Sequence, residues 1–97
     1  MDIPITGAER MFLPEGTMVS SAERKRYSRE DLTYNVTEDI LVAMEDNGID
    51  SKELARRLSK SVSHIDALLS GRRNMTLGVL SDICFELGLK PQLSLVN

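Results

Sequence analysis

The sequence contains one cysteine, one histidine and no tryptophan among its 97 residues. A single cysteine, Cys84, cannot form an intramolecular disulfide, which fits a reducing compartment. One cysteine and one histidine cannot supply the spaced Cys/His pairs of a zinc site, and the chain has no glycine-rich phosphate-binding loop. These absences leave no catalytic, cofactor-binding or metal-binding residue to assign, so we expect a protein that is not an enzyme and has no cofactor.

Long apolar runs are also missing. No stretch approaches the ~18 residues of a membrane span, and the first residues lack the basic segment and apolar stretch of a signal peptide. We therefore expect a cytoplasmic protein that does not contact membranes. Aromatic residues make up 4% of the chain and hydrophobic residues 41%. A core of Leu, Ile, Val, Met and Ala favours a small helical bundle over a sheet, which is usually richer in β-branched and aromatic residues.

Two short helices with a tight turn between them are predicted in residues 50–73. Asp50 and Glu53 form a capping box that starts the first helix. Ser61 is a suitable N-cap for the second helix, and Gly71 is a suitable terminator for it. The apolar residues that recur with helical spacing are Leu54, Ala55, Leu58, Ile65, Leu68 and Leu69.

This pattern resembles the helix-turn-helix of the Cro and lambda-repressor-like superfamily, the XRE-type regulators. The small side chain of Ala55 lets the two helices cross closely, at the steep angle that such motifs use. The resemblance covers roughly residues 36–89 and implies an all-α, lambda-repressor-like bundle that binds double-stranded DNA. The positions that fall in register are Leu54, Ala55, Leu58, Ser61, Ile65, Leu68 and Gly71.

The resemblance also implies that a recognition helix over residues 62–70 enters the major groove of DNA with its N-terminal end first. It places Val62, Ser63 and His64 at the leading end, with Asp66 and Ala67 on the next turn. Ser63 can exchange hydrogen bonds with several base edges, and Val62 can pack on a thymine methyl group. No Arg, Asn or Gln stands at these positions. Specificity then is modest, or it comes from neighbouring basic residues or from DNA shape.

Contacts to the DNA backbone require donors and positive charge at helix starts and loop tips. Such residues lie at the start of the first motif helix, in the turn and in the loop after the second helix. The candidates are Ser51, Lys52, Lys60, Ser61, Arg72, Arg73 and Asn74. Arg56 and Arg57, which we place on the outer side of the first motif helix, are weaker candidates.

Charge is distributed unevenly along the chain. Residues 51–73 hold six basic and two acidic residues, a net charge of +4, whereas the remainder holds six basic and thirteen acidic residues, a net charge of −7. A basic motif on an acidic chain suits a small DNA-binding protein, because only one face meets phosphate. The alternative is that these charges lie on ordinary solvated helix faces.

The chain divides into a predicted N-terminal arm, residues 1–35, and a DNA-binding domain, residues 36–97. The arm is irregular up to residue 20, and a short basic helix over residues 20–31 then either contacts the DNA backbone or is simply solvated. A connection over residues 32–35 leads to a helix over 36–46. A last helix over residues 77–87 completes the bundle. Its predicted buried stripe consists of Leu77, Leu80, Cys84 and Leu87.

Alternating apolar and polar residues predict a short strand at the C-terminal end. Leu93 and Leu95 carry the alternation, and Pro91 fits a strand edge or start. A lone strand cannot satisfy its own backbone hydrogen bonds. It must therefore pair with the N-terminal arm or with its copy in a second subunit.

Together these expectations favour a sequence-specific transcriptional regulator. A homodimeric repressor that binds a palindromic operator, such as that of its own promoter, is the main hypothesis. One alternative is the antitoxin of a toxin–antitoxin pair, in which residues 1–20 mask a toxin partner. Another is a protein-interaction module that keeps the fold without binding DNA.

Overall fold

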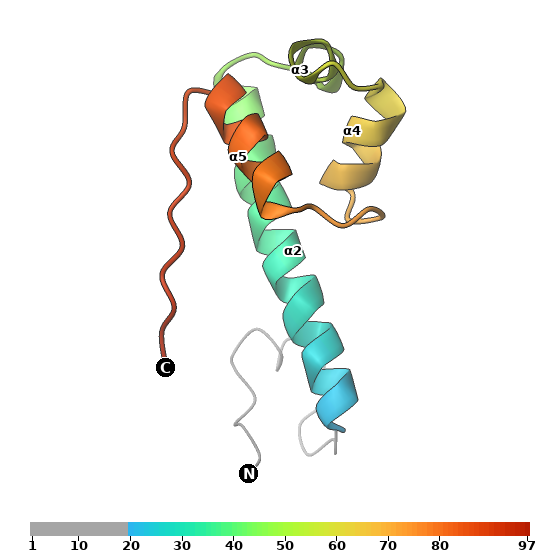
Figure 1. Ribbon diagram of the computed structural model, residues 1–97, viewed down its shortest axis with the longest axis vertical. Helices are drawn as coiled ribbons and strands as arrows, with labels where there is room; N and C mark the ends of the chain where they lie inside the picture. Colours follow the sequence, from blue (N-terminus) through green and yellow to red (C-terminus); the bar gives the residue numbers. More distant parts are fainter. Residues whose placement is uncertain (1–19) are drawn as a thin grey trace. The chain divides into compact units, whose positions relative to one another are not determined.

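The computed structural model describes residues 20–97, most of which lie in four helices (Figure 1). These are α2 (Ser21–Asp46), α3 (Ser51–Leu58), α4 (Val62–Leu69) and α5 (Leu77–Glu86). No strand occurs between residues 20 and 97, and the predicted all-α fold is confirmed. None of the four helices is long and apolar enough to cross a membrane. The predicted irregular segment before residue 20 lies outside the described residues.

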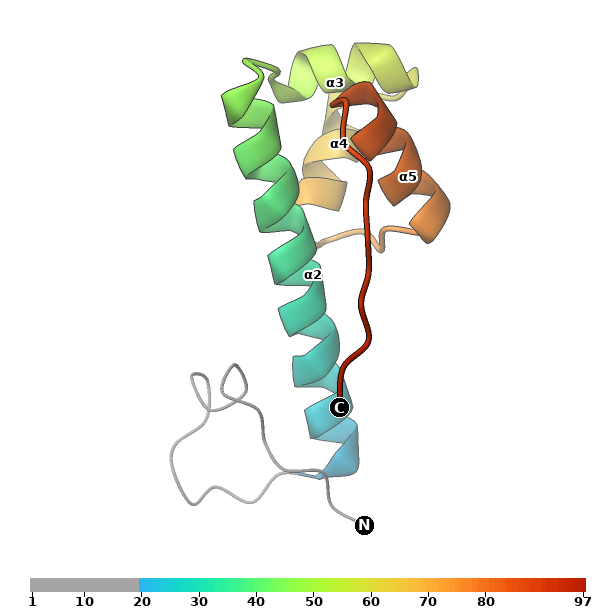
Figure 2. The ribbon, with the colours of Figure 1, turned by 90° about the vertical axis from the view of Figure 1, so that its left-hand side faces the viewer.

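Contacts divide the chain into two units, with the boundary between Val36 and Thr37 inside α2. The second unit contains the end of α2 together with α3, α4 and α5. Within this unit α3 contacts both α4 and α5, and Figure 2 shows α3 running crosswise to α5. The predicted division at residues 35 and 36 into an arm and a DNA-binding domain stays a prediction.

The predicted connection over residues 32–35 is wrong, because α2 is one continuous helix of 26 residues. The segment contains no glycine or proline that would interrupt a helix. The Thr33 hydroxyl donates a hydrogen bond to the Arg29 carbonyl one turn earlier, at 2.9 Å, so this polar side chain is satisfied within the helix. The helix starts with a cap, since the Glu23 amide donates to Ser20 Oγ at 3.1 Å.

The caps predicted for the motif are confirmed. The Glu53 amide donates to the Asp50 carboxylate at 2.9 Å, and the His64 amide donates to Ser61 Oγ at 3.1 Å. Thr76 caps α5 in the same way, with Val79 as the donor. Each cap satisfies one of the amides that a helix start leaves without a partner, and therefore fixes where the helix begins.

The turn of the motif depends on a left-handed residue that is not glycine. Ser59 has φ 54° and ψ 43°, and the next amide, that of Lys60, donates to the Ala55 carbonyl at 2.9 Å. This closure ends α3 and lets α4 begin three residues later. The left-handed conformation costs an L-residue roughly 1–2 kcal/mol. The turn is therefore held by the packing of the helices on either side of it.

The core of the second unit is aliphatic, as composition predicted. Leu54 and Ala55 of α3 are buried, so the predicted close approach at Ala55 fits the structure. Full burial of one Leu or Ile contributes roughly 1.5–3 kcal/mol, which makes these few side chains the main stabilising element of a small domain. The buried apolar residues are Ile40, Met44, Leu54, Ala55, Ile65, Leu68, Leu69, Ile83, Cys84 and Leu87.

Two predictions for the C-terminal part are wrong. Leu77 is 80% exposed, because it is the first residue of α5 and lies outside the stripe formed by Ile83, Cys84 and Leu87. The predicted C-terminal strand is absent, since residues 89–97 are neither helix nor strand. A strand needs a neighbour that supplies backbone hydrogen bonds, and no residue from 20 to 97 forms a ladder with this segment.

Candidate nucleic-acid interface

The core determines which side of α4 faces solvent. Ile65, Leu68 and Leu69 are buried on its inner side. Helical geometry therefore turns the side chains of Val62, Ser63 and Asp66 outward, and all three are exposed, Val62 by 39%. His64 and Ala67 are half-buried at the edge of the same surface. All five predicted base-contacting residues are thus at least partly accessible, and three of them are exposed.

Positive charge surrounds the leading end of α4. Partial burial, together with the charges of Arg73 and Lys60, lowers the pKa of His64 below its ordinary value. A lowered pKa keeps the imidazole neutral at pH 7, so it can donate from one nitrogen and accept at the other. Lys60 belongs to the turn before α4 and Arg73 to the loop after it, so His64 is affected by positive charge from both segments.

The loop after α4 is built around its last turn. Gly71 has φ 78°, a left-handed conformation that glycine adopts without strain, and it reverses the chain. The amide of Arg73 then donates to the Ala67 carbonyl at 3.1 Å. Arg72, Arg73 and Asn74 are exposed, and neither arginine forms an ion pair with any residue in the described part of the chain. Both guanidinium groups are thus open to an external anion.

The start of α3, where Ser51 and Lys52 are predicted to contact the DNA backbone, also contains an acidic residue. Lys52 is exposed and Ser51 is half-buried. The carboxylate of Asp50 accepts the Glu53 amide at the same helix end. A phosphate approaching this helix start would therefore meet a negative charge as well as Lys52. Lys60 and Ser61, in the turn, are exposed, although Ser61 already uses its oxygen as the cap of α4.

Two of the six basic residues of the motif are held within the molecule. Arg56 and Arg57 both donate from Nε to the carboxylate of Glu53, at 3.0 Å each. Arg57 also donates from Nη1 to the carbonyl of Glu86, at the end of α5, at 2.9 Å. Hydrogen bonds from Arg56, and then from Arg57, lower the pKa of Glu53 from 4.5 to about 2. Arg57 thereby ties α3 to α5.

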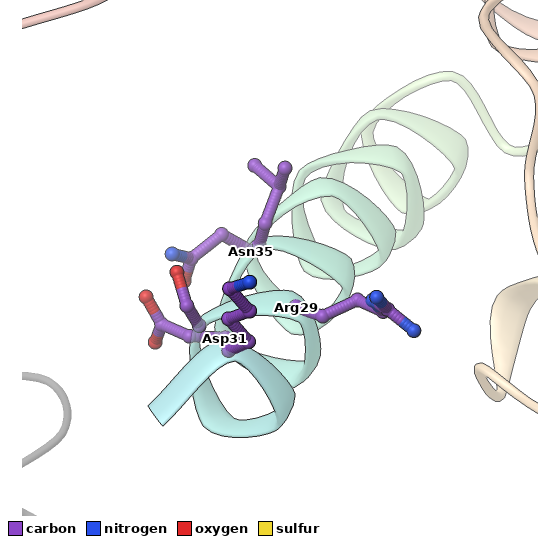
Figure 3. Close-up of a pocket in the computed structure, with 6 residues that line it drawn as sticks. Arg29, Asp31 and Asn35 are labelled. Carbon is purple, nitrogen blue, oxygen red and sulfur yellow. The ribbon is translucent and has the colours of Figure 1, made fainter. Parts of the chain in front are cut away.

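A surface of mixed charge lies on the first half of α2. Its shallow pocket is lined from this one helix, and Figure 3 shows Arg29 and Asp31 pointing to opposite sides. Arg26 lies over the ring of Tyr27, with 5.1 Å from the guanidinium carbon to the ring centre. A lining of mixed charge is typical of a solvated helix face and offers no dedicated anion site. The lining residues are Lys25, Ser28, Arg29, Asp31, Leu32 and Asn35.

A family model described as the Cro/C1-type HTH DNA-binding domain matches residues 39–92, which is more than half of the chain. The chain belongs to the Cro/C1-type helix-turn-helix family. No curated protein and no solved structure gives a significant match. The match begins inside α2 and runs past α5, so it includes the whole of α3, α4 and α5.

Membership of the Cro/C1-type family makes this chain a DNA-binding regulator, and it confirms the resemblance inferred from the motif. The structure adds what the motif did not contain. The tie from Arg57 to Glu86 spans 29 positions in the sequence. The sequence could not predict this hydrogen bond, because nothing in the local spacing around Arg57 distinguishes its side chain from that of Arg56.

We expect the Glu53 cluster to make stability depend on pH. The folded-state pKa of about 2 lies below the ordinary 4.5, so the carboxylate stabilises the fold above about pH 4.5. This contribution is lost as the pH falls toward 2. The difference in unfolding free energy between the wild type and Glu53→Gln should therefore shrink between pH 5 and pH 2 in urea titrations followed by circular dichroism.

Glu38→Gln is the matched control, because Glu38 lies exposed on α2 and forms no ion pair within residues 20–97. Its difference from the wild type should stay nearly constant over the same pH range. If the difference in unfolding free energy for Glu53→Gln is equally constant, the two arginines do not stabilise the Glu53 carboxylate as assigned.

Proposed function

We propose that the chain is a homodimeric transcriptional repressor that inserts the leading end of α4 into the major groove of a palindromic operator. The observation that carries this proposal is the outward surface of α4, which is exposed and has exposed cations in the turn before it and the loop after it, Lys60, Arg72 and Arg73. B-DNA accepts an α-helix in its major groove, and phosphates on either side of the groove attract Lys and Arg. Repression would follow from occlusion of a promoter, with the protein's own promoter as the first site to examine.

The side chains of α4 suggest how bases are recognised. Ser63 can donate to or accept from a base edge, and Val62 can contact a thymine methyl group. The carboxylate of Asp66 can accept from the amino group of cytosine, and a neutral His64 can serve a base acceptor or a phosphate. Ala67 sets how closely the helix approaches. None of these is a bidentate reader, so part of the specificity is assigned to DNA shape.

Backbone contacts are assigned to the cations and donors around α4. Arg72 and Arg73 are the main candidates, because both are exposed and neither forms an ion pair within residues 20–97. The remaining candidates are single positive charges or polar groups at the two helix starts and the loop. They are Ser51, Lys52, Lys60, Ser61 and Asn74.

The homodimer is proposed because one motif recognises too few base pairs for useful selectivity. A two-fold dimer doubles the site, with half-sites about one helical turn apart. The outward face of α5, defined by Leu77, Ser81 and Phe85, supports self-association. These residues are one turn apart along the helix, and Leu77 and Phe85 are 80% and 79% exposed. Two copies of this face can pack against each other across a two-fold axis and bury both apolar side chains, and a second copy is the occupant to which we assign it.

Removal of both loop arginines tests the interface. Arg72→Ala combined with Arg73→Ala should weaken binding to all duplexes, because phosphate contacts carry no sequence information. The slope of log K against log salt should fall in magnitude by up to about two, one for each phosphate contact. Fluorescence anisotropy with the labelled upstream region, at several salt concentrations, measures both quantities.

Arg56→Ala is the matched control for this experiment, because its guanidinium is already paired with Glu53. It should leave the salt slope close to that of the wild type. An unchanged slope in the double variant would remove Arg72 and Arg73 from the interface, and absence of binding by the wild type to any duplex would contradict the proposed function as a whole.

The face of α5 is tested by one charge substitution. Phe85→Glu should convert the dimer into a monomer in light scattering, because two carboxylates would meet across the two-fold axis in an apolar interface. Affinity for the upstream region should fall accordingly. Val42→Glu, an equivalent change on the exposed side of α2, should leave the dimer intact. A monomeric wild type, or a dimer that survives Phe85→Glu, would contradict this assignment.

A further inference from the structure

Ser70 occupies the junction between α4 and the arginine loop. It is the C-cap residue of α4, with φ −91° and ψ −3°. Its hydroxyl donates to the Ala67 carbonyl at 3.3 Å, and the same oxygen accepts from Nε of Arg72 at 2.9 Å. One side chain thus connects the last turn of the recognition helix to the guanidinium group of Arg72.

The direction of these hydrogen bonds explains what the hydroxyl can do. A serine hydroxyl has one proton and two acceptor sites. Because the proton is committed to the carbonyl of Ala67, the acceptor side of the oxygen is turned toward Arg72. The arginine then uses Nε for this bond and keeps its two terminal nitrogens free. These are the groups that form a two-point contact with a phosphate.

The hydrogen bond from Arg72 to Ser70 affects binding mainly through the conformational entropy of the arginine side chain. An exposed arginine side chain has many rotamers, and holding it on a ligand normally loses much of that freedom. A hydrogen bond formed before the ligand arrives reduces this loss. Arg72 has no carboxylate partner within residues 20–97, and Ser70 is its only side-chain partner there.

We propose that Ser70 is a positioning residue that holds the guanidinium of Arg72 ready to bind a DNA phosphate. This inference rests on the proposed function in one respect, the contact between Arg72 and the DNA backbone. Ser70 itself is not assigned a contact with DNA. It acts through Arg72, so its effect must vanish when Arg72 is absent.

A double-mutant cycle tests the proposal. The variants are Ser70→Ala, Arg72→Ala and the two combined, and the probe is a labelled random duplex, because a phosphate contact is independent of sequence. Ser70→Ala should weaken binding about threefold to tenfold, the range expected for one typical intramolecular hydrogen bond. Its salt slope should match that of the wild type, because no charge is removed. Arg72→Ala should lower the slope by about one.

Two results distinguish positioning from a purely structural role. The combined variant should bind as Arg72→Ala does, without a further loss. Ser70→Thr keeps a hydroxyl and should restore most of the wild-type affinity. Thr76→Ala removes the hydroxyl that caps α5, and it should lower thermal stability without weakening binding at a temperature where the variant is folded.

Each other outcome has a definite meaning. Wild-type affinity in Ser70→Ala, with weaker binding in Arg72→Ala, would overturn the role of Ser70 and leave the arginine contact in place. Additive losses in the combined variant would also overturn it, because the two residues would then act independently. Wild-type affinity and slope in Arg72→Ala would overturn both this inference and the arginine part of the proposed interface.

Discussion

Burial of Ile65, Leu68 and Leu69 is the constraint on which the outward surface of α4 depends. These residues fix the rotation of α4 about its axis, and so decide that Val62, Ser63 and Asp66 face solvent. Ala55 of α3 is buried in the same core, where a larger side chain would overpack the helices around it. Loss of one buried methyl group would therefore affect the orientation of the outward surface of α4 as well as the stability of the fold.

Internal pairing decides which charges of the motif are available to a partner. Glu53 holds Arg56 and Arg57 within α3, and Arg57 also stabilises the contact between α3 and α5 through its bond to the Glu86 carbonyl. Lys52, Lys60, Arg72 and Arg73 remain open, near or beyond the ends of α3 and α4. The chain can thus have a net charge of −3 and still present positive charge at one surface. Local charge, rather than the total, determines where DNA can approach.

The sequence predicts best what is determined locally. The helix starts at residues 51, 62 and 77 are each fixed by a cap residue that accepts from the amide three positions later, and the core residues follow from apolar spacing.

The wrong predictions concern features that depend on contacts between distant residues or on the absence of a helix-breaking residue. Residues 32–35 resemble a connection in composition, yet no glycine or proline breaks α2 there. The strand at residues 91–97 was predicted from alternation alone, which cannot supply the neighbour that a strand requires. The hold of Ser70 on Arg72 depends on the left-handed turn at Gly71 and is visible only in three dimensions.

The proposed position of the leading end of α4, in the major groove, can be tested by selecting binding sites from a random pool of duplex DNA. The wild type should enrich a motif with two-fold symmetry. A variant with Ser63→Ala and Asp66→Ala should fold normally and enrich a motif that differs at the same base pairs in both half-sites. An identical motif from the wild type and the variant would contradict the claim, because the exposed side chains of α4 would then take no part in recognition.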